Sequence, residues 1–284
     1  MTRNESIIEL GRWLQTPPGR YLLGWEQACL DEAVADAFGY HALQLGLAQL
    51  QGLRTNRMPH RWVGVDTLHV DAPLDFPVAD PSLSCLPPEQ PVALHCDFDA
   101  LPFPNDSLDL VVLPHALELA RDPHLTLAEV ERVLVPEGRV LIVGLNPASL
   151  WGWRQAMGRS RERVGIGRQR DLFLPRSSEL LGYRRVRDWL RLLSFEVEGA
   201  RFGCWRPPLA TEPWLERFAW MEPLGGRWWP VLGAVYFISA VKRVRGMRLV
   251  GLSRRTAPRP QPAPAVVANR HRHRLTHLDQ DPPS

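Results

Sequence analysis

Apolar and polar residues along the chain follow two different periods, one typical of helices and one typical of strands. Residues 31–38 place apolar side chains on one helix face and are followed by Gly39, which predicts that residues 1–38 are helical. Short apolar runs predict strands at residues 41–47, 60–70, 92–96, 108–114 and 139–145. The fourth run is apolar on both parities apart from Asp109, as expected for a strand buried on both faces of a parallel sheet.

The second half of the chain carries the clearest helix signals. Asp122 is placed to cap a helix that begins at Pro123, where a backbone N–H is not needed. Pro136 and Gly138 are expected to end this helix. A capped amphipathic helix is expected within residues 177–193. The last two strands are predicted at residues 194–202 and 230–243.

Strands that alternate with helices predict an α/β fold with a mostly parallel sheet and helices on both faces. Ligands of such sheets bind beyond the carboxyl ends of the strands. The stretch "CDFDALPF", residues 96–103, places an acid, Asp97, and a Leu-Pro-Phe turn directly after the third predicted strand. The proline-rich residues 71–91 are expected to form a loop between the second and third strands.

Composition limits the compartment and the class of protein. Hydrophobic residues make up 45% of the chain, which is ample for a packed core. The four cysteines are scattered without a CxxC pair, which favours a reducing compartment and indicates neither a zinc site nor a disulfide framework. The first residues lack a signal-peptide pattern, and the longest apolar run, residues 228–241, is shorter than the roughly 20 residues of a membrane span. We therefore expect a cytoplasmic protein without a transmembrane segment.

The formal net charge of +3 comes from the end of the chain. Residues 251–284 hold six arginines and two aspartates, so the preceding residues hold 28 basic and 29 acidic side chains, a net charge of −1. This tail also contains six prolines and no apolar period, which predicts disorder. Weak contact with a nucleic acid or an acidic partner is one hypothesis for the tail, and a passive role is the other.

Residues 97–147 read "DFDALPFPNDSLDLVVLPHALELARDPHLTLAEVERVLVPEGRVLIVGLNP". This stretch resembles the signature of class I S-adenosylmethionine-dependent methyltransferases of the type-11, UbiE-like group. That signature joins an acid, a Leu-Pro-Phe turn and a Ser-x-Asp strand to a helix with an Asp-Pro start and a Glu-x-x-Arg-Val-Leu end. The stretches "FGYHALQLG" from Phe38 and "GLNPASLWGWR" from Gly144 are similar to the YafS-like branch of this group.

The resemblance covers residues 92–147 closely and residues 30–245 in strand order. It implies a Rossmann-like class I methyltransferase fold, with a mostly parallel seven-stranded sheet whose last strand is antiparallel. It also implies S-adenosyl-L-methionine as the cofactor, and leaves the methyl acceptor unknown.

The resemblance further implies roles for residues that follow the strands. Asp97 is expected to accept a hydrogen bond from the adenine amino group, and the backbone N–H of Phe98 is expected to contact the ring. Asp66, at the close of the second strand, is expected to hold the ribose. The alternative for Asp97 is a turn or cap aspartate, although Asp99 is the expected turn residue. The alternative for Asp66 is a loop aspartate.

The loop after the first strand departs from the family pattern of an acid, one residue and three alternating glycines. Gln44 stands where the acid would hold the methionine amine, and Gly46 is the glycine that remains. Ala48 and Leu50 replace the other two glycines, and the bulky Leu50 is expected at or near the pocket floor. Glycine lets a backbone approach a ligand in conformations that a Cβ disfavours, so these replacements argue against tight cofactor binding.

Pro114, His115 and Glu118 follow the fourth strand and are expected over the sulfonium side of the cofactor. His115 is a candidate general base, because the unperturbed pKa of histidine lies near neutrality. The alternative is a structural histidine at the entry of a helix. The chain lacks the Asn-Pro-Pro-aromatic box of amine-methylating family members at this place, which argues against methylation of a nucleic-acid or glutamine amine.

Two further groups of residues are candidates for binding. Six arginines lie between residues 154 and 170. One hypothesis is that they bind an anionic substrate or a nucleic acid, and the other is that they belong to a solvated charged linker. Five tryptophans lie between residues 205 and 229. They are candidates for an apolar acceptor pocket or a membrane contact, but for Trp228 and Trp229 we expect core packing.

The sequence thus predicts a helical segment at 1–38, a methyltransferase-like domain at 39–250 and a disordered basic tail at 251–284. The first functional hypothesis is an S-adenosylmethionine-dependent methyltransferase with an unknown acceptor, which the intact Asp97 and Leu-Pro-Phe turn favour. The alternative is a catalytically inactive, methyltransferase-like binding or scaffolding module, which the degenerate loop after Gln44 favours.

Overall fold

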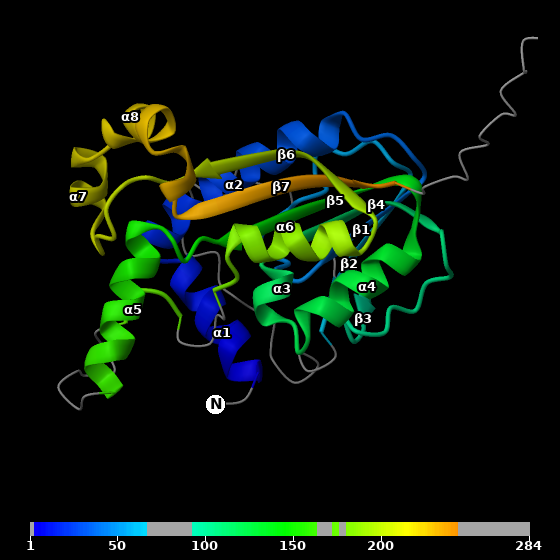
Figure 1. The fold of residues 1–284 in the computed structure, drawn as a ribbon, viewed down its shortest axis with the longest axis horizontal. Coiled ribbons are helices and arrows are strands. Elements are labelled where there is room, and N and C mark those ends of the chain that lie inside the picture. The colour runs from blue at the N-terminus through cyan, green and yellow to red at the C-terminus, as the bar shows by residue number, and fades with distance from the viewer. Residues whose placement is uncertain (1–2, 67–92, 164–171, 176–179, 244–284) are drawn as a thin grey trace, which may run out of the picture. The chain divides into compact units, whose positions relative to one another are not determined.

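The computed structural model describes residues 3–66, 93–163, 172–175 and 180–243 (Figure 1). Residues 1–245 form one compact unit and residues 246–284 another, and the first unit alone is described below. The N-terminal helices belong to the same unit as the sheet. The loop expected at 71–91 and the disorder expected at 251–284 lie outside the described residues.

Seven strands form one sheet in the order β3-β2-β1-β4-β5-β7-β6. Strand β7 is antiparallel to both of its neighbours, and the other neighbouring strands are parallel. The strands are β1 (His41–Leu45), β2 (His60–Val65), β3 (Leu94–His95), β4 (Leu108–Pro114), β5 (Leu134–Leu145), β6 (Phe195–Gly203) and β7 (Val235–Lys242). This arrangement confirms the predicted Rossmann-like sheet with an antiparallel last strand, and it brings the carboxyl ends of β1 to β5 to one edge.

Helices cover both faces of the sheet, as predicted (Figure 1). The helices are α1 (Arg3–Leu14), α2 (Pro17–Ala35), α3 (Ala116–Leu119), α4 (Pro123–Val133), α5 (Leu150–Arg163), α6 (Tyr183–Leu192), α7 (Glu212–Arg217) and α8 (Met221–Trp228), with a 3₁₀ turn, η4 (Pro230–Leu232). Leu30 of α2 belongs to the apolar core of one face, and Leu127 of α4 and Leu190 of α6 belong to the core of the other. None of the helices described has both the length and the apolar character of a membrane span.

Element boundaries differ from the prediction where local chemistry intervenes. The helix predicted at 1–38 is two helices, because Thr16 caps α2 and Pro17 occupies its first turn. Asp122 caps α4 as predicted, with its carboxylate accepting from two backbone N–H groups. Helix α4 ends at Val133 rather than at Pro136, because β5 begins at once at Leu134. Pro136 and Gly138 instead fall where the register of β4 and β5 shifts.

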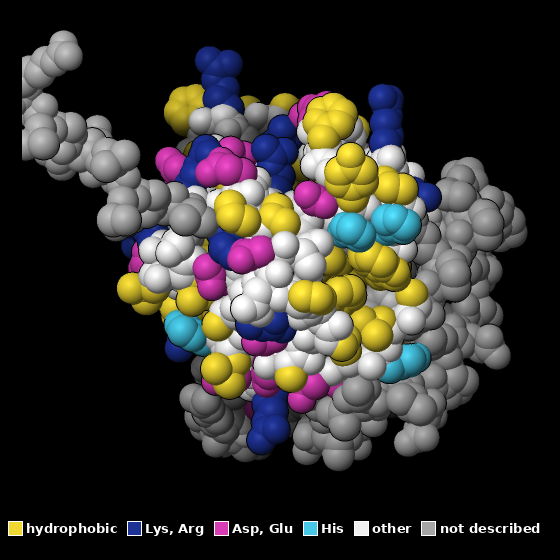
Figure 2. All heavy atoms as spheres, turned by 90° about the vertical axis from the view of Figure 1, so that its right-hand side faces the viewer, with side chains coloured by type: hydrophobic (Ala, Val, Ile, Leu, Met, Phe, Trp, Pro, Cys, Tyr) yellow, Lys and Arg dark blue, Asp and Glu magenta, His cyan; other side chains and the backbone are white. Residues whose placement is uncertain are grey.

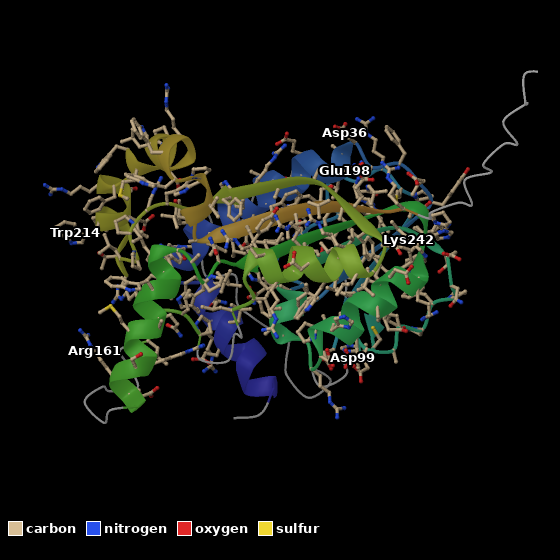
Figure 3. All side chains as sticks on the ribbon, viewed as in Figure 1. Asp36, Asp99, Arg161, Glu198, Trp214 and Lys242 are labelled. Atoms are coloured by element: carbon tan, nitrogen blue, oxygen red, sulfur yellow. The ribbon has the colours of Figure 1, made fainter. Side chains whose placement is uncertain are left out.

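The single lysine of the chain closes the end of the unit at which β7 finishes. This end carries charged side chains of both signs among apolar ones (Figure 2), and Lys242 lies toward it (Figure 3). The buried Lys242 Nζ donates to the carbonyl oxygens of Glu131 and Leu134, at 2.8 Å each, and to Asp106 Oδ1 at 2.7 Å. It therefore ties β7 to the junction of α4 and β5.

We expect Lys242→Met to lower the free energy of unfolding by about 2–4 kcal/mol, because two buried carbonyl oxygens lose their donor. Arg243→Ala is the matched control: this neighbour pairs with exposed carboxylates, and its loss should cost about 1 kcal/mol or less. Urea unfolding of both variants measures the difference. Equal losses in the two variants would contradict a structural role for the buried amine.

Candidate cofactor and acceptor site

Four residues predicted to form the site lie within two positions of four neighbouring strand ends. Gly46 follows β1, Asp66 follows β2, Asp97 comes two residues after β3, and His115 follows β4. Because these strands are parallel, the four positions share one edge of the sheet. Backbone groups at Gly46 and side chains at the other three strand ends can face a ligand that lies across the edge.

Two carboxylates flank Cys96 at the ends of β2 and β3. Burial, together with the charges of Asp66 and Asp97, raises the pKa of the Cys96 thiol to about 11. Asp66 is almost fully buried, whereas Asp97 is half-buried. Asp97 Oδ1 also accepts a hydrogen bond from the N–H of Asp99 at 3.2 Å, as a turn aspartate does. The two acids predicted to hold adenosine are therefore close to one thiol, and Asp97 has a turn contact as well.

The turn after Asp97 is held by two residues of α4 that the sequence reasoning did not single out. The guanidinium of Arg132 donates to the carbonyl oxygens of Leu101, at 3.0 Å, and Phe103, at 2.9 Å. Glu129 accepts from the N–H of Leu101 at 3.0 Å and pairs with Arg132, whose hydrogen bond lowers the pKa of Glu129. The Glu-x-x-Arg spacing within the signature is the sequence signal for this clamp, which fixes the Leu-Pro-Phe turn.

Gly46 is required by the geometry of the loop after β1. Its φ of 108° is one that side chains rarely adopt, and a Cβ there would lie 2.9 Å from the carbonyl oxygen of Pro114. Its N–H donates to the carbonyl oxygen of Gly64 at 3.0 Å. The close approach thus joins the ends of β1, β2 and β4.

Gln44 closes this loop from within. Its Nε2 donates to the carbonyl oxygens of Leu47, at 2.9 Å, and Leu50, at 2.6 Å, while its Oε1 accepts from the N–H of Gly52 at 2.8 Å. The Leu50 side chain belongs to the apolar core on the α2 face. The side-chain amide predicted to face the methionine amine is therefore used to hold three backbone groups of its own loop.

The residues after the loop form turns rather than a helix. Between the end of β1 and the start of β2, residues 46–59 contain turns and bends but no helix. Dinucleotide-binding loops of related sheets place the positive end of a helix at the ligand. This loop offers backbone N–H groups without that helix end.

His115 is the most constrained residue at this edge. It has a φ of 53°, a left-handed conformation, and its side chain is fully buried. Its Nε2 lies 2.9 Å from Glu26 Oε1, and its Nδ1 lies 3.1 Å from Glu118 Oε2. Glu118 Oε1 accepts the backbone N–H of Leu145, the last residue of β5. The imidazole therefore joins α2, α3 and the end of β5.

The charges in this cluster favour extra protons. Burial alone would lower the pKa of His115, but the carboxylates of Glu26 and Glu118 outweigh it and raise that pKa well above its ordinary value. Burial also raises the pKa of Glu26, and His115 offsets part of that rise. Glu26 Oε2 is buried without a hydrogen-bond partner. Sequence reasoning missed Glu26, because it lies 89 residues from His115 and no motif marks it.

Aromatic side chains cover the neighbourhood of the β5 end. The ring of Trp151 in α5 lies edge-on to those of Trp13, at 6.0 Å, and Phe173, at 5.2 Å. Gln155 Oε1 accepts from the N–H groups of Phe173 and Leu174, which holds residues 172–175 against α5. Helix α1 also contacts α3, directly after His115. These segments form a candidate wall for an acceptor.

A methyltransferase domain family, of type 11, matches residues 78–142. The uncharacterized protein YafS of Escherichia coli is 36% identical over 107 residues, 38% of this chain and 40% of that protein. The malonyl-[acyl-carrier protein] O-methyltransferase of Halorhodospira halophila is 34% identical over 82 residues, 29% of this chain and 28% of that protein.

The similarity to type-11 methyltransferases covers less than half of this chain in each of these comparisons. The matched part spans 40% or less of the length of each of these curated relatives. Among solved structures, the methyltransferase in complex with the Haloferax volcanii Trm112 activator aligns with a TM-score of 0.49 at 17% identity, covering 85% of this chain and 99% of that one.

S-adenosylmethionine, the cofactor that this methyltransferase family implies, fits one half of the edge better than the other. Carboxylates are the acceptors that ribose hydroxyls and an adenine amine require, and Asp66 and Asp97 place two of them at adjacent strand ends. On the methionine side, Gln44 is engaged with its own loop. These carboxylate acceptors therefore fit the adenosine part of the cofactor. The methionine part would depend on backbone groups near Gly46.

The clamp at Gln44 can be tested by placing an acid at this position, as in the methyltransferase pattern. We expect Gln44→Asp to lower the free energy of unfolding by about 2–4 kcal/mol, because the carbonyl oxygens of Leu47 and Leu50 lose their donor. Gln49→Ala, a change at a half-buried position of the same loop, should cost within about 0.5 kcal/mol. Chemical unfolding measures both. A stable Gln44→Asp protein would show that the clamp is dispensable.

The buried cluster should make stability depend on pH. An unfolded histidine loses its proton near pH 6.5, whereas folded His115 keeps its proton to a higher pH because its pKa is raised. The stabilisation is therefore complete below about pH 6.5 and is lost as the pH rises toward the folded pKa. Glu26, whose pKa is also raised, acts in the same direction from a lower pH.

We expect the free energy of unfolding, measured with urea, to fall between pH 6.5 and 8.5. Glu26→Gln should flatten that fall, because it removes one of the two carboxylates that hold the proton on His115. Nitrogen chemical shifts of the imidazole would report the protonated ring directly. A neutral His115 at pH 7 would contradict the assignment.

Proposed function

We propose that this protein is an S-adenosylmethionine-dependent methyltransferase. The observation that carries the proposal is that Gly46, Asp66, Asp97 and His115 lie within two residues of four adjacent strand ends of a β3-β2-β1-β4-β5-β7-β6 sheet. The curated relatives include the Chlamydia pneumoniae demethylmenaquinone methyltransferase, 39% identical over 54 residues, 19% of this chain and 24% of that protein. The identity of the acceptor does not follow from these relatives, because the matched segments are short.

The roles proposed for this chain divide along the edge. Asp97 would accept from the adenine amine, the N–H of Phe98 would contact the ring, and Asp66 would accept from the ribose. Gly46 and Pro114 would form the floor at the methionine side. When bound, the cofactor would supply an electrophilic methyl group. Orienting the acceptor in line with that group can supply much of the rate, so strong acid–base help is not required.

The His115 cluster would act by position rather than as a base. Against the effect of burial, two flanking carboxylates raise the pKa of His115 well above its ordinary value, so this ring holds its proton and is a poor candidate to accept one. Glu26 Oε2 is a buried acceptor of this cluster that has no hydrogen-bond partner. We propose that His115 fixes Glu26 and Glu118 beside the sulfonium side, which follows the structural alternative considered for this histidine rather than the candidate general-base role.

A binding or scaffolding module is the second candidate. The clamp of Gln44 on Leu47, Leu50 and Gly52 favours it, because the clamp closes the loop that the family uses for methionine. The turns that replace a helix after β1 point in the same direction. The two candidates differ in whether the intact chain binds S-adenosylmethionine and S-adenosylhomocysteine.

Calorimetry with both ligands tests the proposal, with Asp97→Ala as the decisive variant. We expect the substitution to weaken binding by about 1–3 kcal/mol, since the adenine amine loses a charged acceptor. Asp99→Ala is the matched control, because Asp99 lies two residues away and accepts instead from Thr126 Oγ1 at 2.9 Å. That variant should bind like the wild type.

Two results would contradict parts of the proposal. If the folded wild type binds neither ligand, the binding-module candidate replaces the enzyme. If Asp97→Ala and Asp99→Ala bind equally well, Asp97 is a turn residue alone. Thermal-shift measurements give an independent check, because a ligand at 100 times its Kd should stabilise the fold by about 2.7 kcal/mol.

A further inference from the structure

Large apolar side chains are exposed together on α5 and on the segment between β6 and β7. Of the thirteen large hydrophobic side chains that are exposed among the described residues, nine come from α5 and residues 214–232. These nine, here called the tryptophan surface, are Leu150, Trp153, Trp214, Trp220, Leu224, Trp228, Trp229, Val231 and Leu232. Trp228 and Trp229 are 68% and 56% exposed, so the core packing expected for them is wrong.

The tryptophan surface is the outer face of an ordered segment. The ring nitrogen of Trp205 donates to the carbonyl oxygen of Trp229 at 3.1 Å, and its backbone N–H donates to Glu222 Oε2 at 3.3 Å. Gly225 packs so closely on Trp205 that an added Cβ would lie 2.2 Å from the ring. Leu215 of α7 is buried. The inward positions are therefore filled, and the exposed rings are held outward.

This segment leaves the sheet at the edge that carries the candidate site. Val235, the first residue of β7, pairs with both Leu145 at the end of β5 and Gly203 at the end of β6. Helix α5 is joined to the same segment, because Trp151 Nε1 donates to the carbonyl oxygen of Arg206 at 2.7 Å. Arg154 donates to the carbonyl oxygen of Pro208 as well. Figure 1 shows α5, α7 and α8 at one end of the unit.

Positive charge borders the tryptophan surface. The sequences of α5, α7 and α8 together hold six arginines and four glutamates, for a net charge of +2. The arginines are Arg154, Arg159, Arg161, Arg163, Arg217 and Arg227, and the glutamates are Glu162, Glu212, Glu216 and Glu222. Arg161 and Trp214 lie at the same end of the unit, far from Lys242 (Figure 3).

We propose that the tryptophan surface docks on a phospholipid bilayer that contains anionic headgroups. A tryptophan ring has an apolar body and one N–H donor, and it prefers the boundary between acyl chains and headgroups. Guanidinium groups bind phosphates with two donors each, so the bordering arginines complement the headgroups. Anchoring through one apolar face requires no spanning helix.

The charges argue for a bilayer over a second copy of the chain. A symmetric dimer through this surface would bring the same arginine-bordered face together with itself. Like charges at such an interface repel one another, whereas an anionic bilayer attracts all of them. If the proposed function is right, docking would also let an apolar acceptor reach the carboxyl edge of the sheet from the lipid phase.

Vesicles of phosphatidylglycerol and phosphatidylcholine with brominated acyl chains test this, because bromine quenches tryptophan fluorescence at short range. We expect the full-length wild type to be quenched on binding. Trp228→Ser combined with Trp229→Ser should weaken binding about tenfold or more, measured by vesicle flotation. Phe38→Ser is the matched control, since Phe38 is 82% exposed but precedes β1 at the opposite edge. Residues 251–284 contain no tryptophan, so lipid contact by them alone would not reproduce the quenching.

Three results would overturn the proposal. The first is an unquenched wild type at low salt, and the second is equal binding by the double variant. The third is a wild type that sediments as a dimer and does not bind vesicles, together with a double variant that sediments as a monomer. This result would assign the surface to a second copy of the chain. These measurements need no cofactor, and the calorimetry above needs no vesicles, so failure of docking and failure of the methyltransferase proposal are separable.

Discussion

One buried imidazole sets the arrangement of the carboxyl edge. His115 lies between Glu26 and Glu118 with its side chain out of contact with water. Charged groups buried in this way are tolerated when each finds a partner, and removing one partner leaves the others costly. The three residues come from α2, from the end of β4 and from α3, and Glu118 also holds the end of β5. The position of α2 over the edge therefore follows from the charge balance of the cluster.

Much of the fold could be predicted from the sequence, because its signals are local. Asp122 and Pro123 mark the start of α4 through a cap that needs two neighbouring N–H groups and nothing distant. The run at 108–114 reads as a central strand because both of its faces are buried. The end of α4 was missed, since Pro136 and Gly138 are accommodated by a register shift that depends on the partner strand β4.

The candidate site could be predicted only in part, because its decisive contacts are distant in sequence. Asp97 and His115 are found by their place after strands. Glu26 has no local signal, and its role exists only once α2 is packed on the sheet. The role of Gln44 could not be predicted either. A glutamine in place of the family's acid suggests a lost binding site, and its three backbone partners are visible only in the structure. The burial of Trp228 and Trp229 was also predicted wrongly, because both side chains are exposed in the structure.

The two halves of the edge rely on different kinds of support. On the side proposed for adenosine, Arg132 and Glu129 hold the Leu-Pro-Phe turn from outside, and the carboxylates of Asp66 and Asp97 lie at the ends of β2 and β3. On the methionine side, Gln44 holds its loop from inside, so the loop is stable without a ligand. A loop that is already ordered loses less conformational entropy when a ligand binds. It also has fewer hydrogen-bonding groups left to contact that ligand. Any affinity for a methionine moiety must then come from backbone groups around Gly46 and from the carboxylates fixed by His115.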